Sequence, residues 1–200
     1  MGVFIAFAAY VRIKMRKFDE VPKGLQNVVE AIVELFEGYL NTTVGDKLMF
    51  LGSWFFTVFL FILVSNLSGV IPGIRPPTAD WSMTVGLAIV TFIMTQAMGV
   101  RFRKGEYLKS MLKPIFLFLP VNIIGELARP ISISFRLFGN MLAGLIMMSL
   151  IYFLFPPFAL FVIPAALHVY FDLFSGILQT YIFCTLSLSF ISGAAEVADG

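Results

Sequence analysis

Charged residues, histidine and cysteine are all scarce in this 200-residue chain. Charged residues make up 13% of it, against about 25% in ordinary soluble domains. The single cysteine, Cys184, cannot form an internal disulfide, and with the single histidine, His168, it provides too few ligands for a protein-only zinc site. We find no phosphate-binding glycine loop, nucleophile elbow or heptad run. These absences favour ion or proton handling, and we expect no metal, cofactor or nucleic acid.

Apolar residues dominate what is present. Hydrophobic residues make up 59% of the chain and its mean hydropathy is +0.92, a composition typical of proteins that cross the membrane several times. Because lipid offers no hydrogen-bond partners to the backbone, the spanning segments are expected to be helices. We therefore predict an all-α polytopic membrane protein that forms a single membrane domain over residues 1–200.

Apolar runs and helix breakers divide the chain into about five membrane helices and two further elements. The membrane helices are expected at 1–11 (a partial first helix), 48–67, 82–100, 131–155 and 158–192. An amphipathic interfacial helix is expected at 22–40. Prolines at 114 and 120 predict a short re-entrant helix at 114–128. The last two helices exceed the roughly 20 residues that cross a bilayer, so we expect strong tilt.

Basic residues predict the topology. They gather between Arg12 and Lys23 and again over 101–113, whereas the loop 68–81 has Arg75 as its only basic residue. The positive-inside rule puts both basic segments in the cytoplasm and the loop outside. By alternation, the N-terminus is expected outside and the C-terminus in the cytoplasm.

Arg136 lies inside the apolar helix predicted at 131–155. Its guanidinium cannot lose a proton, and placing it at mid-bilayer costs at least about 3 kcal/mol. Arg129, beside Pro130, can snorkel to the interface. Arg136 lies about two helical turns further in, where snorkelling is harder. We therefore interpret Arg136 as a functional residue.

Each of the last two predicted helices carries a polar stripe. Arg136 and Asn140 are four residues apart and share one helical face. The second stripe follows steps of four, three and four residues and consists of His168, Asp172, Ser175 and Gln179. Two long apolar helices with facing polar stripes are expected to line a hydrated path.

Several polar residues have two interpretations. Asp172 is either a proton relay, because a carboxyl group in a wet cavity can bind and release a proton, or a structural residue bonded to His168; we favour the relay. Glu126 either serves the path or forms a local ion pair with Arg129. Gln96 is interpreted as an interhelical hydrogen-bond donor.

The motif Arg136-Leu-Phe-Gly-Asn140, followed by Met141 and Ala143-Gly144, resembles subunit a of the F-type ATP synthase. The resemblance covers nearly the whole chain. The supporting segments are Ser65-Asn66-Leu67 with Ile71-Pro72-Gly73, Pro77-Thr-Ala-Asp80, Pro120-Val-Asn122 with Glu126, and Gln179-Thr-Tyr-Ile-Phe183.

This resemblance implies an ion-translocating stator subunit in the cell inner (plasma) membrane. Its implied partners are the c-subunit ring, the peripheral-stalk b subunits and the remaining ATP synthase subunits. Two offset aqueous half-channels would carry protons or sodium ions to and from the ring carboxylates. The chain itself would bind no nucleotide and would not be an enzyme, since the whole complex is the enzyme.

The resemblance also implies roles for individual residues. Arg136 matches the essential arginine, which attracts the ionised ring carboxylate and separates the half-channels. Asn140 and Gln179 match polar positions near it, and Glu126 matches an acidic position of the cytoplasmic half-channel. Many relatives carry a glutamate at the position of Leu145 and a histidine at that of Asp172.

The apolar Leu145 and the acidic Asp172 therefore suggest that the titratable group has moved to the facing helix. Asp172 becomes the candidate relay of the external half-channel, with His168 one turn away. The N-terminal segment is also shorter than the family pattern.

Two other function classes fit the sequence less well. A secondary transporter carrying a small anion to Arg136 would be expected to show internal repeats, and no convincing repeat is present. A purely structural anchor would need neither Arg136 nor Asp172.

Overall fold

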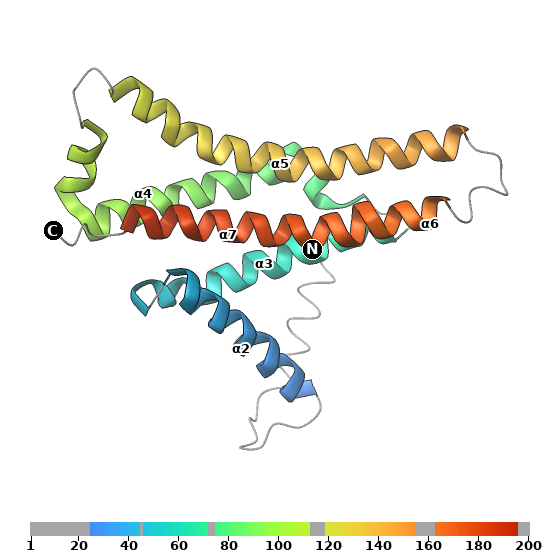
Figure 1. Cartoon of the computed structure of the whole chain (residues 1–200), viewed down its shortest axis with the longest axis horizontal. Coiled ribbons are helices and arrows are strands. Elements are labelled where there is room, and N and C mark those ends of the chain that lie inside the picture. Colours follow the sequence, from blue (N-terminus) through green and yellow to red (C-terminus); the bar gives the residue numbers. More distant parts are fainter. Residues whose placement is uncertain (1–24, 45, 72–74, 113–118, 155–162, 196–200) are drawn as a thin grey trace. The chain divides into compact units, whose positions relative to one another are not determined.

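The computed structural model describes residues 25–44, 46–71, 75–112, 119–154 and 163–195 (Figure 1). All regular structure in those ranges is helical, as predicted. The helix expected at 1–11 lies outside them. The chain divides into two compact units, residues 1–52 and 53–200.

The first unit contains α2 (Leu25–Val44) and the 3-10 helix η1 (Asp46–Leu51). The helix α2 covers most of the range 22–40, where an amphipathic interfacial helix was predicted, and runs to Val44. On its polar side, Gln26 donates a hydrogen bond to Glu30 at 2.7 Å. Leu40 is buried and packs beside Gly52, where an added Cβ would lie 3.2 Å from its side chain.

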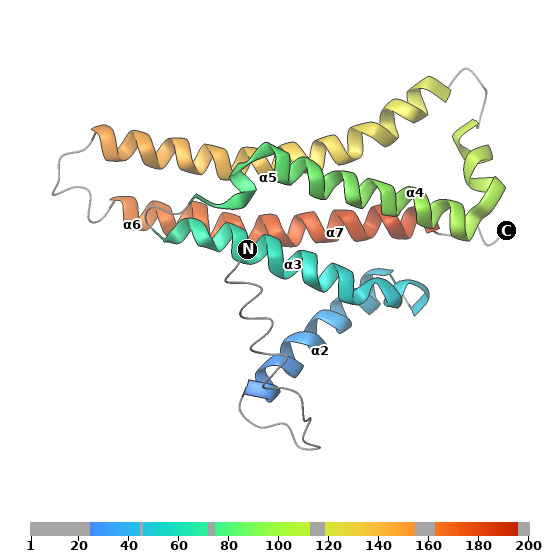
Figure 2. The same cartoon turned by 180° about the vertical axis from the view of Figure 1, so that it is seen from behind.

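The second unit is a bundle of long helices (Figures 1 and 2). Its helices are α3 (Gly52–Leu67), α4 (Trp81–Leu112), α5 (Leu119–Leu154), α6 (Ile163–His168), the π-helix η5 (Val169–Ser175) and α7 (Gly176–Ala195). Within the residues that the structure describes, four stretches are long and apolar enough to cross a membrane: Leu48–Val70, Trp81–Lys104, Leu119–Leu154 and Ala166–Ala195. They correspond to the four predicted spans after residue 40, so the chain is a multi-pass membrane protein.

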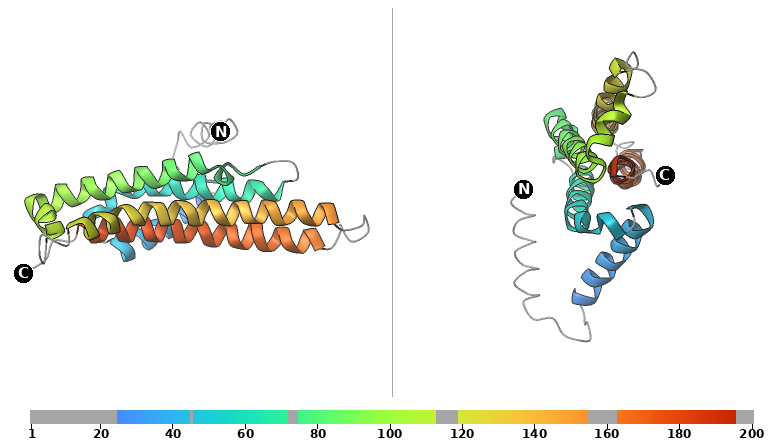
Figure 3. Two further views of the ribbon diagram at one scale, coloured as in Figure 1. Left: turned by 90° about the horizontal axis from the view of Figure 1, so that it is seen from above. Right: turned by 90° about the vertical axis from the view of Figure 1, so that its left-hand side faces the viewer.

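Three helices build the apolar core between them. Val58 and Ile62 of α3, Ile133 and Leu137 of α5, and Phe183 and Cys184 of α7 form one buried cluster. Leu87 of α4 packs against it. Figure 3 shows α5 side by side with the continuous helix made of α6, η5 and α7. The cluster therefore fixes α5 and α7 as neighbours.

The helix α5 is continuous where the sequence predicted a re-entrant helix at 114–128 and a separate helix at 131–155. Pro130 lies inside α5 without ending it. A proline removes one backbone donor, but neighbouring helices can compensate for this in a packed bundle. At a rise of 1.5 Å per residue, α5 is about 54 Å long, which exceeds the ~30 Å hydrocarbon core. Residues 114–118 lie outside the described ranges.

The helix α4 turns back sharply near its end. Lys104 has φ 47° and ψ −126°, so two helical arms meet there (Figure 2). The short arm returns Tyr107 to the long arm. A Cβ added to Gly99 would lie 2.7 Å from the Tyr107 ring. Glycine at 99 therefore permits the ring to approach the backbone this closely.

The π-helix η5 corrects the predicted second stripe. The prediction that His168, Asp172 and Gln179 lie on one helical face assumed that the whole segment is an α-helix. Over Val169–Ser175 the backbone is a π-helix, whose wider i→i+5 turns change the angular position of every following residue. His168 and Gln179 therefore do not share the face that a 3.6-residue period predicts.

Candidate functional site

Arg136 lies at the middle of the 36-residue helix α5, and its side chain is exposed. Among the side chains that the structure describes, none forms an ion pair or hydrogen bond with it. A guanidinium stays charged under all physiological conditions. Arg136 therefore presents a fixed positive charge on the outer face of the bundle.

One turn along α5, Asn140 connects to α7. Its Nδ2 donates a hydrogen bond to Oε1 of Gln179 at 2.9 Å. Gln179 is 1% exposed, and its Nε2 is buried without a hydrogen-bond partner in the described part of the chain. The predicted pair of polar residues near Arg136 is thus brought together across two helices.

Asn66 forms a second polar connection that the sequence did not predict. Its Nδ2 donates to the Gly176 carbonyl oxygen at 3.0 Å and to Thr180 Oγ1 at 3.1 Å. Its Oδ1 accepts from the Thr78 hydroxyl at 2.6 Å. Asn66 is 0% exposed, so it joins the end of α3, the loop before α4 and the junction between η5 and α7. In the sequence, Asn66 is singled out only within the segment Ser65-Asn66-Leu67, which supports the family resemblance.

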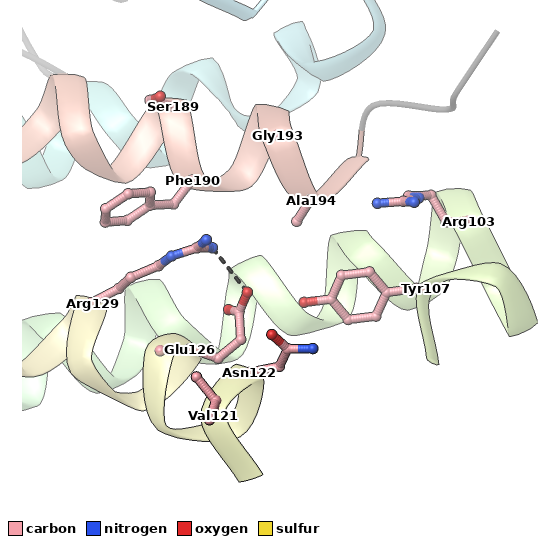
Figure 4. Close-up of a pocket in the computed structure, with 11 residues that line it drawn as sticks. Arg103, Tyr107, Val121, Asn122, Glu126, Arg129, Ser189, Phe190, Gly193 and Ala194 are labelled. Carbon is pink, nitrogen blue, oxygen red and sulfur yellow. Dashed lines mark hydrogen bonds and ion pairs between the residues drawn. The ribbon is translucent and has the colours of Figure 1, made fainter. Parts of the chain in front are cut away.

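Glu126 lies at the centre of a third polar group, and Figure 4 shows it with Arg129 and Tyr107, two of the other members. Arg129 Nη1 donates to its Oε1 at 2.9 Å, so the local ion pair considered for these two residues is present. Gln96 Nε2 approaches Oε2 at 3.4 Å from α4, which confirms Gln96 as an interhelical donor. Tyr107 completes the group by donating to Gln96 Oε1 at 2.9 Å.

A cavity of about 550 Å³ opens beside Glu126. Its polar lining consists of Arg103, Tyr107, Asn122, Glu126, Arg129 and Ser189 (Figure 4). Burial, followed by the negative charge of Glu126, raises the pKa of the Tyr107 phenol above its usual value. The cavity thus places a carboxylate, two guanidinium groups and a neutral phenol around space large enough for several water molecules.

A second cavity of about 940 Å³ adjoins the loop before α4. The loop contributes Arg75 and Asp80 to its lining, and α5 contributes Leu142, Leu145 and Phe153, among others. Asp80 caps α4, since its Oδ1 accepts from the Ser82 hydroxyl at 2.7 Å and from the Ser82 amide at 2.9 Å. Those bonds to Ser82 hold the pKa of Asp80 below its usual value.

The candidate relay residues are described to different extents. His168 is partly buried, and its Nε2 lies 3.4 Å from the Tyr152 hydroxyl oxygen. The backbone of Asp172 belongs to η5, while its side chain lies outside the described residues. The predicted contact between Asp172 and His168 therefore stays a prediction.

Arg136 falls between the two cavities along α5. The first cavity is lined on α5 from Val121 to Arg129 and the second from Phe138 to Phe153. Arg136 is not among the described residues that line either cavity. At 1.5 Å per residue, Arg136 lies about 15 Å along the axis from Glu126 and about 14 Å from Leu145.

Comparison with known proteins shows the family to which the chain belongs. The family model for the ATP synthase A chain matches residues 1–192. ATP synthase subunit a 2 of Syntrophotalea carbinolica is 39% identical, over 89% of this chain and 76% of the relative. ATP synthase subunit a of Syntrophobacter fumaroxidans is 34% identical, over 90% and 75%.

The name of a further relative specifies an ion. The protein called ATP synthase subunit a, sodium ion specific, of Propionigenium modestum is 37% identical, over 92% of this chain and 68% of the relative. The match of nearly the whole chain to the family model, together with the polar groups on α5 and α7, identifies this protein as a member of the ATP synthase A chain family.

Proposed function

We propose that the chain is the ion-translocating stator subunit of a rotary ATP synthase, with Arg136 as the barrier between two aqueous half-channels. The observation that carries this proposal is the order of three features along α5: a cavity at Glu126, the exposed Arg136, and a second cavity at Leu145. When water fills both cavities, the part of α5 around Arg136 is what separates them.

Electrostatics explains how Arg136 would act there. A fixed guanidinium repels a proton or sodium ion passing along α5, which closes a direct leak. The same charge attracts an ionised carboxylate on a partner, and the attraction is strong where the lipid excludes water. A partner carboxylate must release its ion to pair with Arg136 and bind one to move away. This requirement would couple ion flow to movement of a ring of c subunits.

Asp172 and His168 would serve the external half-channel. Both precede α7, and Tyr152 at the far end of α5 contacts His168. Their titratable groups would replace the one missing at Leu145. Glu126 would serve the cytoplasmic half-channel, because the basic segment 101–113 adjoins its cavity through Arg103 and Tyr107.

The remaining parts follow from the same topology. The N-terminus would lie outside and the C-terminus in the cytoplasm of the inner (plasma) membrane. The amphipathic α2 would lie at the interface, and α5 with α6, η5 and α7 would tilt strongly beside the ring. Both protons and sodium ions fit this arrangement. The b subunits and the other synthase subunits would complete the assembly.

The test uses the whole ATP synthase in membrane vesicles. Arg136→Gln keeps a polar side chain, although a shorter one, and removes the charge, and Arg101→Gln makes the same change at the end of the span Trp81–Lys104. Assembly is verified first, and then ATP-driven ion uptake and passive ion leak are measured. We expect Arg136→Gln to abolish uptake and increase leak, with Arg101→Gln close to wild type. Normal uptake by an assembled Arg136→Gln complex would refute the proposal.

The relay is tested separately with Asp172→Asn and Asp172→Glu. The amide cannot bind and release a proton, whereas the longer carboxylate can. If Asp172 relays protons, uptake falls in Asp172→Asn and recovers at least partly in Asp172→Glu. Equal uptake in wild type and Asp172→Asn would remove Asp172 from the path and leave the role of Arg136 intact.

A further inference from the structure

Tyr107 and Gln96 have no part in the mechanism described so far, yet they continue the hydrogen bonds of Glu126 across two arms of α4. The Tyr107 hydroxyl donates to Gln96 Oε1 at 2.9 Å, and Gln96 Nε2 donates to Glu126 Oε2 at 3.4 Å. Arg129 donates to the other carboxylate oxygen, Oε1, at 2.9 Å. Each oxygen of Glu126 thus faces a donor, one from α5 itself and one from α4.

The chemistry of Glu126 and Tyr107 fixes the direction of the hydrogen bonds that run between them through Gln96. An ionised carboxylate only accepts hydrogen bonds, so the amide must turn its nitrogen toward Glu126. The amide oxygen then faces Tyr107, which must donate and therefore stay protonated. Burial and the charge of Glu126 both favour the protonated phenol. With Glu126 accepting at both oxygens, the hydrogen bonds run in one direction, from Tyr107 through Gln96 to the carboxylate.

Packing holds the donor chain in place. Tyr107 is 5% exposed, and its ring lies so close to Gly99 that an added Cβ would be 2.7 Å away. The reversal at Lys104 brings the ring there. Gln96 lies about one turn before Gly99 on the long arm. The turn, the glycine and the two polar side chains form one unit that reaches Glu126 from outside α5.

We propose that Tyr107 and Gln96 are positioning residues for Glu126, which hold its carboxylate in place beside Arg129 at the cavity. This inference rests on the proposed function, in which Glu126 belongs to the cytoplasmic half-channel. The two residues act through Glu126 and need not touch the ion. Their removal would take a hydrogen-bond donor away from the carboxylate, and we expect this to change the pH range in which the half-channel works.

Among the described residues, three charged or titratable groups face Glu126. Arg129 comes from α5, and Arg103 and Tyr107 come from α4 around the reversal. The part of α7 that lines the cavity contributes no titratable side chain among its described residues: Ser189, Phe190, Gly193 and Ala194. Arg129 stays in place in the variants below, so the expected pH shift is moderate.

The experiment measures ATP-driven uptake by the whole complex in inside-out vesicles, over a range of medium pH. In these vesicles the cytoplasmic half-channel faces the medium. Tyr107→Phe removes the hydroxyl but keeps the ring on Gly99, and Tyr170→Phe removes a hydroxyl from an exposed residue of η5 that does not line the cavity. We expect Tyr107→Phe to move the acidic limb of the profile to higher pH by about half to one unit. We expect Tyr170→Phe to match wild type.

Two further variants keep the inference testable if Tyr107→Phe assembles poorly. Gln96→Glu places a second carboxylate beside Glu126, and because the two must share a proton, the limb should move further in the same direction. Gly99→Ala displaces the Tyr107 ring, whereas Gly86→Ala on the same helix meets no atom within 4 Å. Gly99→Ala should reproduce the shift of Tyr107→Phe, and Gly86→Ala should not.

The possible outcomes separate this inference from the proposed function. Unshifted profiles in assembled Tyr107→Phe and Gln96→Glu complexes would overturn the positioning role, even if Arg136→Gln abolishes uptake. Retained uptake in Arg136→Gln would refute the proposed function itself. A lower maximal rate without a shifted limb would indicate a packing role for Tyr107 and would also overturn the inference.

Discussion

Asn140 and Gln179, which are 39 residues apart in the chain, join α5 to α7 through one hydrogen bond of 2.9 Å. Gln179 is almost fully buried, so its amide depends on Asn140 for a partner. A buried polar group that loses its partner costs about 1–3 kcal/mol, whereas replacing both partners by apolar groups can be nearly neutral.

The variant Asn140→Leu should therefore destabilise the packing of α5 on α7 by about 1–3 kcal/mol. The double variant Asn140→Leu with Gln179→Leu should recover most of that loss. The measurement is a double-mutant cycle on the thermal dissociation midpoint of the detergent-solubilised complex. If the stability losses of the two single variants simply add in the double variant, the hydrogen bond does not couple Asn140 to Gln179.

Asn66 should be more sensitive to substitution than its position at a helix end suggests. Asn66→Ala removes hydrogen bonds to Gly176, Thr78 and Thr180, for an expected loss of about 2–4 kcal/mol. Thr57→Ala, which removes an exposed hydroxyl bonded within its own helix, is the matched control. Amide hydrogen exchange should rise around residue 78 and around Gly176 in Asn66→Ala only. Unchanged protection at both places would contradict this prediction.

The cap of α4 should depend on pH. Bonds from Ser82 lower the folded-state pKa of Asp80. A lowered pKa means that the carboxylate contributes stability above its unfolded pKa of about 3.9, and that this stability is lost as pH falls through the folded value. Amide protection at Ser82, corrected for intrinsic exchange, should decline in that acidic range for wild type. Asp80→Asn should remove the dependence while retaining part of the cap; a wild-type decline that persists in Asp80→Asn would point to another group.

The Tyr107 phenol should titrate above the usual tyrosine range. Its pKa is raised by burial and by the charge of Glu126, so the protonated form contributes stability below the unfolded pKa of about 10, and this is lost as pH rises through the folded value. Replacing Glu126 by Gln removes the charge and should lower the Tyr107 pKa. The ultraviolet absorbance of tyrosinate, taken as the difference from Tyr107→Phe, gives the titration. An unchanged pKa in Glu126→Gln would show that burial alone raises it.

Much of the fold could be predicted because it depends on local composition. Apolar length and the scarcity of charge predict spanning helices directly, since lipid leaves the backbone few alternatives. The range 82–100, where a membrane helix was expected, lies within α4. The break expected before 131 is absent, because Pro130 can be accommodated inside α5 when neighbouring helices pack around it. A single-sequence argument about proline has no access to those neighbours.

The candidate site divides in the same way. The sequence by itself determined that Arg136 is a permanent charge in an apolar helix, that Asn140 lies one turn from it and that Gln96 is a polar residue inside a span. Only the tertiary structure decided which distant groups meet: Asn140 with Gln179, Asn66 with Gly176, and Tyr107 with Gln96 and Glu126. It also decided the π-helix at Val169–Ser175, which changes the face that the following residues occupy. The physical reason is that burial cost and helix periodicity are local, whereas the partner of a buried polar group depends on which helices pack together and in which register.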